Sequence, residues 1–171
     1  MARSATVFAM NDETSALSWA VAAGAAGEEV IDRWRWNRAI EVPIGGLWEA
    51  VRLTRDLGEA TLHRLRRAKE PVGLVLEVPL RGAVEFLVPR GTAASWPTIG
   101  GTVAVADGTM RWPAPGASAA NGRRAICGRR WLVAPAAVAS VVTDADALCE
   151  AVAATIAHER FARSRAGDHS A

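Results

Sequence analysis

Between Gly73 and Val133 the sequence is divided into short apolar segments that are bounded by glycine, proline or charged residues. These segments are Gly73–Val78, Ala83–Val88, Thr102–Ala106, Thr109–Trp112 and Trp131–Val133. Short runs of this kind between turn residues are typical of β-strands. Apolar residues at helical spacing lie mainly before and after this region. The pattern predicts an α/β fold in which a mixed or mainly antiparallel sheet is flanked by helices.

Two turn signals suggest how these strands pair. Leu80-Arg81-Gly82 separates the first two segments by a distance that suits a hairpin. Asp107-Gly108 lies between the third and fourth segments, and this dipeptide is the strongest short-range hairpin signal in the chain. Both pairs are therefore expected to be antiparallel hairpins.

Helices are expected in three places. One runs from Thr14 to about Asp32, and Arg33-Trp34-Arg35-Trp36 follows it as a connector before a short strand at Ala39–Val42. A second runs from Leu47 towards Ala68 with a break near Gly58. The third spans about 144–163, opens with the capping box Thr143-Asp144-Ala145-Asp146, and carries an apolar stripe. That stripe is Leu148, Val152 and Ile156, with Phe161 as a possible extension.

The length of 171 residues, half of them apolar, is sufficient for one domain with a sizeable core. We expect a single domain over residues 1–163 and a disordered tail over 164–171. The longest uncharged apolar run, Ser15–Gly27, is about half of what a membrane span needs. The first residues leave no room for a signal peptide, because Asp12 and Glu13 follow Arg3 closely. A cytoplasmic protein without membrane contact is predicted.

Sequence motifs of common enzymes are missing. No Walker loop, Gly-x-Gly-x-x-Gly, Gly-x-Ser-x-Gly or His-Glu-x-x-His pattern occurs. With only two cysteines (Cys127 and Cys149) and three histidines, a zinc site is not expected, and no cofactor is predicted. Asp144 and Asp146 form the one Asp-x-Asp pair, and their place at a helix start explains them as capping residues.

Arginine is concentrated in two clusters, although net charge is only +2. Guanidinium groups beside a tryptophan can hold phosphates and stack on a base. The predicted nucleic-acid-binding residues are Arg64, Arg66 and Arg67 in the first cluster, beside His63 and Lys69, and Arg123, Arg124, Arg129, Arg130 and Trp131 in the second. Two exposed surfaces without a ligand are the alternative. Trp34 and Trp36 are a further candidate for an exposed binding pair, whereas core packing is expected of the other tryptophans.

Five motifs spread over most of the chain resemble the N-terminal catalytic domain of bifunctional DNA primase/polymerases, and in particular its short actinobacterial-type relatives. They are Ala39-Ile-Glu-Val-Pro-Ile-Gly-Gly-Leu, Phe86-Leu-Val-Pro-Arg-Gly-Thr-Ala-Ala-Ser-Trp96, Gly101-Thr-Val-Ala-Val-Ala-Asp-Gly, Trp112-Pro-Ala-Pro115 and Trp131-Leu-Val-Ala-Pro135. In that family an Asp-x-Asp pair, a histidine and a third aspartate serve the metals that bind the nucleotide. The resemblance places these positions at Glu41, Pro43, Val84 and Ala104. It implies the family's fold with a degenerate, non-catalytic site.

Three functional hypotheses follow. The first is a non-catalytic binding or regulatory module that acts through a protein partner or as a homodimer. The second is a nucleic-acid or nucleotide binder that uses the arginine clusters without metal-dependent catalysis. The third is an enzyme that uses Glu41, Glu77, Glu85 or His63 in a new arrangement.

Overall fold

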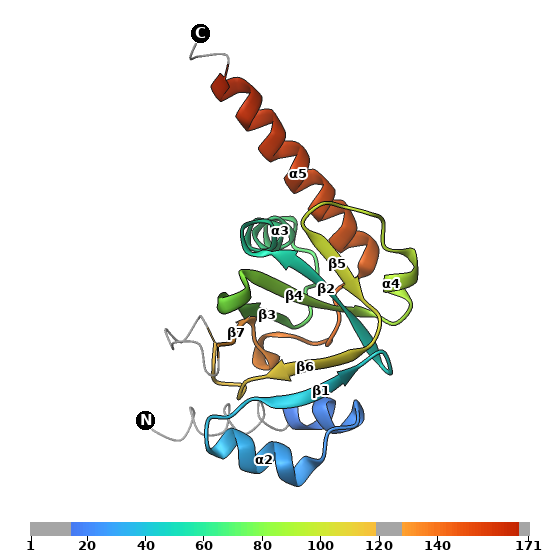
Figure 1. The fold of residues 1–171 in the computed structure, drawn as a ribbon, viewed down its shortest axis with the longest axis vertical. Coiled ribbons are helices and arrows are strands. Elements are labelled where there is room, and N and C mark those ends of the chain that lie inside the picture. The colour runs from blue at the N-terminus through green and yellow to red at the C-terminus, as the bar shows by residue number, and fades with distance from the viewer. Residues whose placement is uncertain (1–14, 119–127, 168–171) are drawn as a thin grey trace.

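A five-stranded sheet forms the centre of the computed structural model, which describes residues 15–118 and 128–167 (Figure 1). The strand order is β5-β2-β4-β3-β7, and every neighbouring pair is antiparallel. In that order the strands span Thr102–Val105, Trp48–Thr54, Ala83–Pro89, Val75–Val78 and Arg130–Val133.

Helices cover one face of this sheet, and a two-stranded ribbon covers the other (Figure 1). The helices are α3 (Arg55–Ala68) and α5 (Ala145–Gly167). The ribbon pairs β1 (Ile40–Ile44) with β6 (Gly108–Trp112), and a helix over 15–22 and α2 (Gly27–Arg35) pack with it. The short helix α4 (Thr92–Ser95) lies in the loop after β4. The predicted fold class, an antiparallel sheet flanked by helices, is confirmed.

The segment before α3 was expected to be helical and is instead the inner strand β2. Trp48 and Ala50 face the ribbon, whereas Val51 and Leu53 face the helices, so both sides of β2 are buried. A strand buried on both faces is a nearly continuous apolar run, and periodicity alone cannot distinguish such a run from a helix. Gly58 does not break α3: a Cβ at this position would lie 2.5 Å from the Val84 Cβ, so glycine permits close packing of α3 on β4.

One predicted hairpin is confirmed and the other is wrong. β3 and β4 pair from Val78 opposite Ala83 to Val75 opposite Phe86, across the short turn Pro79–Arg81. β5 and β6 do not pair with each other, because β5 joins β2 while β6 joins β1. Gly108, at a φ of +114°, begins β6 where the chain passes from the sheet to the ribbon.

The N-terminal helix prediction was too long. The chain breaks between 22 and 27, where Gly24 has a φ of +107°, and α2 then includes most of the predicted connector. Trp34 is buried and donates its indole N–H to the Trp112 carbonyl at 3.4 Å, so it is a core residue and not a binding residue. Trp36 is 67% exposed. Pro43 lies within β1, opposite Thr109.

Helix α5 begins one residue later than the capping box predicts. Asp144 Oδ1 accepts the Ala147 N–H at 2.9 Å and caps the helix, whereas the buried Thr143 hydroxyl accepts the Gly73 N–H at 3.0 Å. Leu148 and Val152 are buried as predicted, but Phe161 is exposed. The helix continues to Gly167, past the predicted start of the tail, and its C-terminal part extends beyond the sheet (Figure 1).

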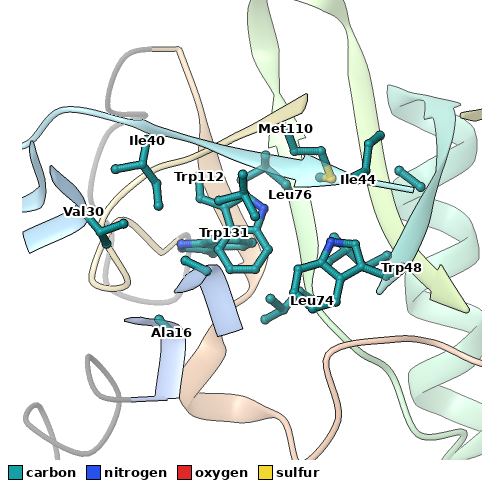
Figure 2. Close-up of a cluster of buried hydrophobic side chains, with 14 of the residues drawn as sticks. Ala16, Val30, Ile40, Ile44, Trp48, Leu74, Leu76, Met110, Trp112 and Trp131 are labelled. Atoms are coloured by element: carbon teal, nitrogen blue, oxygen red, sulfur yellow. The ribbon is translucent and has the colours of Figure 1, made fainter. Parts of the chain in front are cut away.

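Three tryptophans fill the core between sheet and ribbon (Figure 2). Trp48 stacks on Trp112 with ring centroids 5.8 Å apart, and Trp112 meets Trp131 edge-on at 5.5 Å. All three side chains are buried, which confirms packing as the role of these residues. None of the helices in the described residues combines the length and apolar composition needed to cross a bilayer.

Candidate functional site

Arg130 of the second arginine cluster is built into the fold. Arg130 Nε is hydrogen-bonded to Glu77 Oε2, and the Glu77 side chain is fully buried. The prediction that a base stacks on Trp131 is wrong, because the indole is fully buried. The Arg130 guanidinium neutralises a buried charge, and its side chain is 30% exposed, so a nucleic-acid contact of Arg130 stays a prediction. Arg129 is half-buried and has an interaction partner, and Arg123 and Arg124 lie outside the described residues.

A second arginine reaches the same buried carboxylate. Arg55 Nε lies 3.3 Å from Glu77 Oε1 and 3.1 Å from Glu59 Oε1. The hydrogen bond with Glu59, together with the negative charge of Glu77, raises the pKa of the Arg55 guanidinium above its usual value. Two cations thus flank Glu77, which explains how a carboxylate is accommodated inside the domain.

The other buried carboxylates also have structural partners. Glu85 Oε1 accepts from Arg52 at 2.8 Å (Nε) and 2.7 Å (Nη2). The Glu49 carboxylate accepts the backbone N–H groups of Gly91 at 2.9 Å and Ala93 at 2.6 Å, at the start of α4. Within the described residues, no three His, Cys, Asp or Glu side chains are grouped so that they could hold a metal ion.

The positions that the family resemblance assigns to a degenerate metal site do not meet. Val84 and Ala104 both lie on the helix-covered face, opposite Leu53 and Val51 of β2, and Val84 is fully buried beneath Gly58. Glu41 belongs to the ribbon, where its 60% exposed side chain pairs with Arg111 at 3.3 Å. Pro43 lies on the same ribbon strand. No open face therefore brings all four positions together.

The first arginine cluster is divided by the geometry of α3. Arg66 Nη2 donates to the Leu132 carbonyl at 2.9 Å and so ties α3 to β7. Arg64 and Arg67 face a groove of about 670 Å³ between α3 and α5. Arg64 Nε donates to the Thr155 hydroxyl of α5 at 3.3 Å, and Arg67 is exposed.

Two histidines line this same groove. His63 comes from α3 and His158 from α5, and Thr155 and Glu159 complete the polar lining. The sequence placed His63 among arginines, but the contribution of His158 was missed. The two histidines are 95 positions apart, and only the packing of α3 against α5 brings them to one groove.

A second groove, of about 550 Å³, lies between α2 and β1 and is also lined by arginines. Here the charges are largely compensated. Arg33 Nε lies 2.8 Å from Glu29 Oε1, and Arg111 pairs with Glu41, which leaves Arg38 as the additional cation. The α3–α5 groove differs because neither Arg64 nor Arg67 has a carboxylate within ion-pair distance in the described part of the chain.

The two edges of the central sheet also differ. On the outer side of β7, the Trp131 N–H donates to the Ala117 carbonyl at 2.8 Å, and Ser118 forms a parallel bridge with the strand. On the outer side of β5, no further strand is found among the described residues. Val103 of β5 is 59% exposed.

Comparisons with family models, with curated proteins and with solved structures give no match. Descent from a primase/polymerase-type domain therefore stays a prediction that rests on sequence motifs. The functional conclusions below are drawn from the geometry of this chain alone.

Proposed function

We propose that this protein is a non-catalytic binding module that works by self-association, with the edge strand β5 as the contact between two copies. The observation that carries this proposal is the contrast between the two sheet edges: β7 is covered by residues 117–118, whereas no strand of the described residues pairs with the outer side of β5, where the Thr102 N–H donates to the Ile99 carbonyl at 3.1 Å. An uncovered edge strand is a template for pairing with another chain.

The backbone of β5 has the geometry for such pairing. Gly101 O accepts the Thr54 N–H at 2.9 Å, and alternation along the antiparallel ladder then directs the N–H and C=O of Ala104 away from β2. No backbone hydrogen bond from the described residues reaches Ala104 on that outer side. These two groups are available to a second strand.

The sequence of β5 suits pairing with itself. In an antiparallel pair centred on Ala104, Ala104 meets its own copy, and Val103 lies opposite Val105 of the second chain. None of the residues 102–106 is charged, so no like charges are brought together. The edge also lacks the lysine and proline residues with which many proteins protect such strands. The contact would join two five-stranded sheets into one continuous sheet with two-fold symmetry.

The partners of the buried carboxylates favour a binding role over catalysis. Glu77 and Glu85 form ion pairs with arginines, and Glu49 accepts hydrogen bonds from backbone N–H groups. None of them converges with His63, so the enzyme hypothesis gains no support. The expected cytoplasmic location is part of this proposal.

Sedimentation velocity over a range of protein concentrations tests the proposal. We expect the wild type to form a concentration-dependent dimer, and Val103→Lys to be monomeric at concentrations where the wild type is dimeric. Leu80→Lys is the matched control, because Leu80 is 90% exposed and lies outside β5. A wild type that stays monomeric, or a Val103→Lys variant that still forms dimers, would contradict the proposal. If Leu80→Lys disrupts the dimer as strongly as Val103→Lys does, the loss of the dimer is a nonspecific effect of the added charge, and β5 is not the contact.

A further inference from the structure

We propose that the groove between α3 and α5 binds the phosphate group of a small ligand through His63, Arg64, Arg67 and His158. This function is separate from self-association, since the groove lies on the helices and β5 lies at the sheet edge. Two guanidinium groups and two imidazole rings line a groove of about 670 Å³. That volume is within the range of small-molecule sites.

Arg64 is held in place across the groove. Its Nε donates to Thr155 Oγ1 at 3.3 Å, and the Thr155 hydroxyl in turn donates to the Ala151 carbonyl at 2.7 Å. Thr155 itself is 4% exposed. One edge of the guanidinium is thus oriented by the protein, and its two terminal nitrogens are left to donate to a ligand. An arginine positioned in this way loses less side-chain entropy when it binds a phosphate.

The charge of the groove is positive and is not compensated locally. Glu159 is the one carboxylate among its lining residues, and Glu159 Oε2 lies 3.9 Å from Arg163 Nη2. Glu70 and Glu150 line a smaller cavity on another side of Arg64, at more than ion-pair distance from it. Six other arginines in the described residues are paired with carboxylates: Arg33, Arg52, Arg55, Arg111, Arg130 and Arg163.

The donor set determines the class of ligand. Guanidinium groups bind phosphate oxygens in a bidentate manner, and imidazole N–H groups add further donors. No tryptophan, tyrosine or phenylalanine is among the described residues that line the groove, so it lacks the large aromatic platforms on which bases of a single strand usually stack. These features favour recognition of a phosphate group on a small molecule over binding of single-stranded nucleic acid.

Calorimetric titration with inorganic pyrophosphate tests this site, with Arg67→Ala as the main variant. Arg67 is exposed on α3, so its loss should leave the fold intact. Removing one charge-assisted contact should weaken binding about tenfold or more. Arg35→Ala is the matched control, because Arg35 is an exposed helical arginine that does not line the groove. Equal weakening in both variants would overturn the site in favour of diffuse electrostatic attraction, and no detectable pyrophosphate binding would also overturn it.

Two further measurements make the assignment specific. The first is sulfate binding by the double variant His63→Ala/His158→Ala. Both imidazole rings are exposed, so the double variant should keep its fold. We expect sulfate to bind the double variant more weakly than the wild type, because two N–H donors that line the groove are removed. Equal sulfate affinity in the two proteins would overturn the role of the histidines.

A single-stranded oligonucleotide completes the test. If it binds far more tightly than pyrophosphate and its binding is insensitive to Arg67→Ala, the small-ligand proposal is overturned and a nucleic-acid surface elsewhere is indicated. The monomeric variant Val103→Lys should bind pyrophosphate as the wild type does. The site and the proposed self-association can therefore fail independently.

Discussion

The two arginine clusters look alike in the sequence, but Arg130 of the second and Arg64 and Arg67 of the first have different surroundings in the structure. In the second arginine cluster, Arg130 of β7 contacts the fully buried carboxylate of Glu77 and is followed by the core residue Trp131. In the first arginine cluster, Arg64 and Arg67 of α3 face an open groove, and neither forms an ion pair with a carboxylate in the described residues. The difference arises from where the acidic residues lie: β3 brings Glu77 next to Arg130, whereas α5 presents His158 and Thr155 to Arg64. A cluster of arginines therefore indicates a binding surface only when its charges are not already neutralised within the fold.

The largest effect that distinguishes the clusters is expected from Arg130→Ala. This change leaves Glu77 buried with Arg55 as its one remaining cation, and loss of a partner from a buried ion pair costs about 3–5 kcal/mol of unfolding free energy. Arg67→Ala should change stability by less than about 0.5 kcal/mol, because Arg67 is exposed and unpaired in the described residues. Urea denaturation measures both. Similar costs for the two variants would remove the distinction between a structural and a groove-facing cluster.

An intermediate effect is expected from Gly58→Ala, which displaces the helix that carries the first cluster. The new Cβ would lie 2.5 Å from the Val84 Cβ, so α3 must move away from β4. Overpacking of this kind costs about 1–3 kcal/mol, and thermal unfolding would measure it.

The double variant Gly58→Ala/Val84→Ala provides the control for this contact. It should recover part of the stability, since truncation of Val84 removes the two methyl groups at 2.9 and 3.1 Å, while the Val84 Cβ at 2.5 Å remains. If Gly58→Ala is as stable as the wild type, close packing of α3 on β4 does not set the position of the groove.

The smallest effect is expected from Thr155→Val, which keeps the shape of the side chain but removes the hydroxyl that orients Arg64. The cost in stability should be about 1 kcal/mol, the value of a typical hydrogen bond. Pyrophosphate binding should weaken severalfold, because Arg64 would no longer be held across the groove. Unchanged binding would show that the orientation of Arg64 is not needed, and would leave Arg67 and the histidines as the principal contacts.

Much of the fold could be predicted from local patterns. The β3–β4 hairpin, the strand at Arg130–Val133 and the apolar stripe of α5 were recognisable because turn chemistry and periodicity act over a few residues. The segment Trp48–Thr54 was predicted as a helix because a strand buried on both faces has no alternating polar side. Asp107-Gly108 has the composition of a hairpin turn, but the strands on either side of it do not pair with each other. β5 pairs with β2, and β6 pairs with β1.

For the candidate site, the sequence by itself determined which side chains are available, namely the arginines of α3 and a histidine among them. It also showed that common catalytic motifs are missing. Only the tertiary structure decided which of these charges remain free to bind a ligand. Helix α5 brings His158 to the groove, β3 supplies Glu77 as the carboxylate partner of Arg130, and residues 117–118 cover one sheet edge. The physical reason is that neutralisation and burial depend on contacts between residues far apart in the chain, which no local pattern encodes.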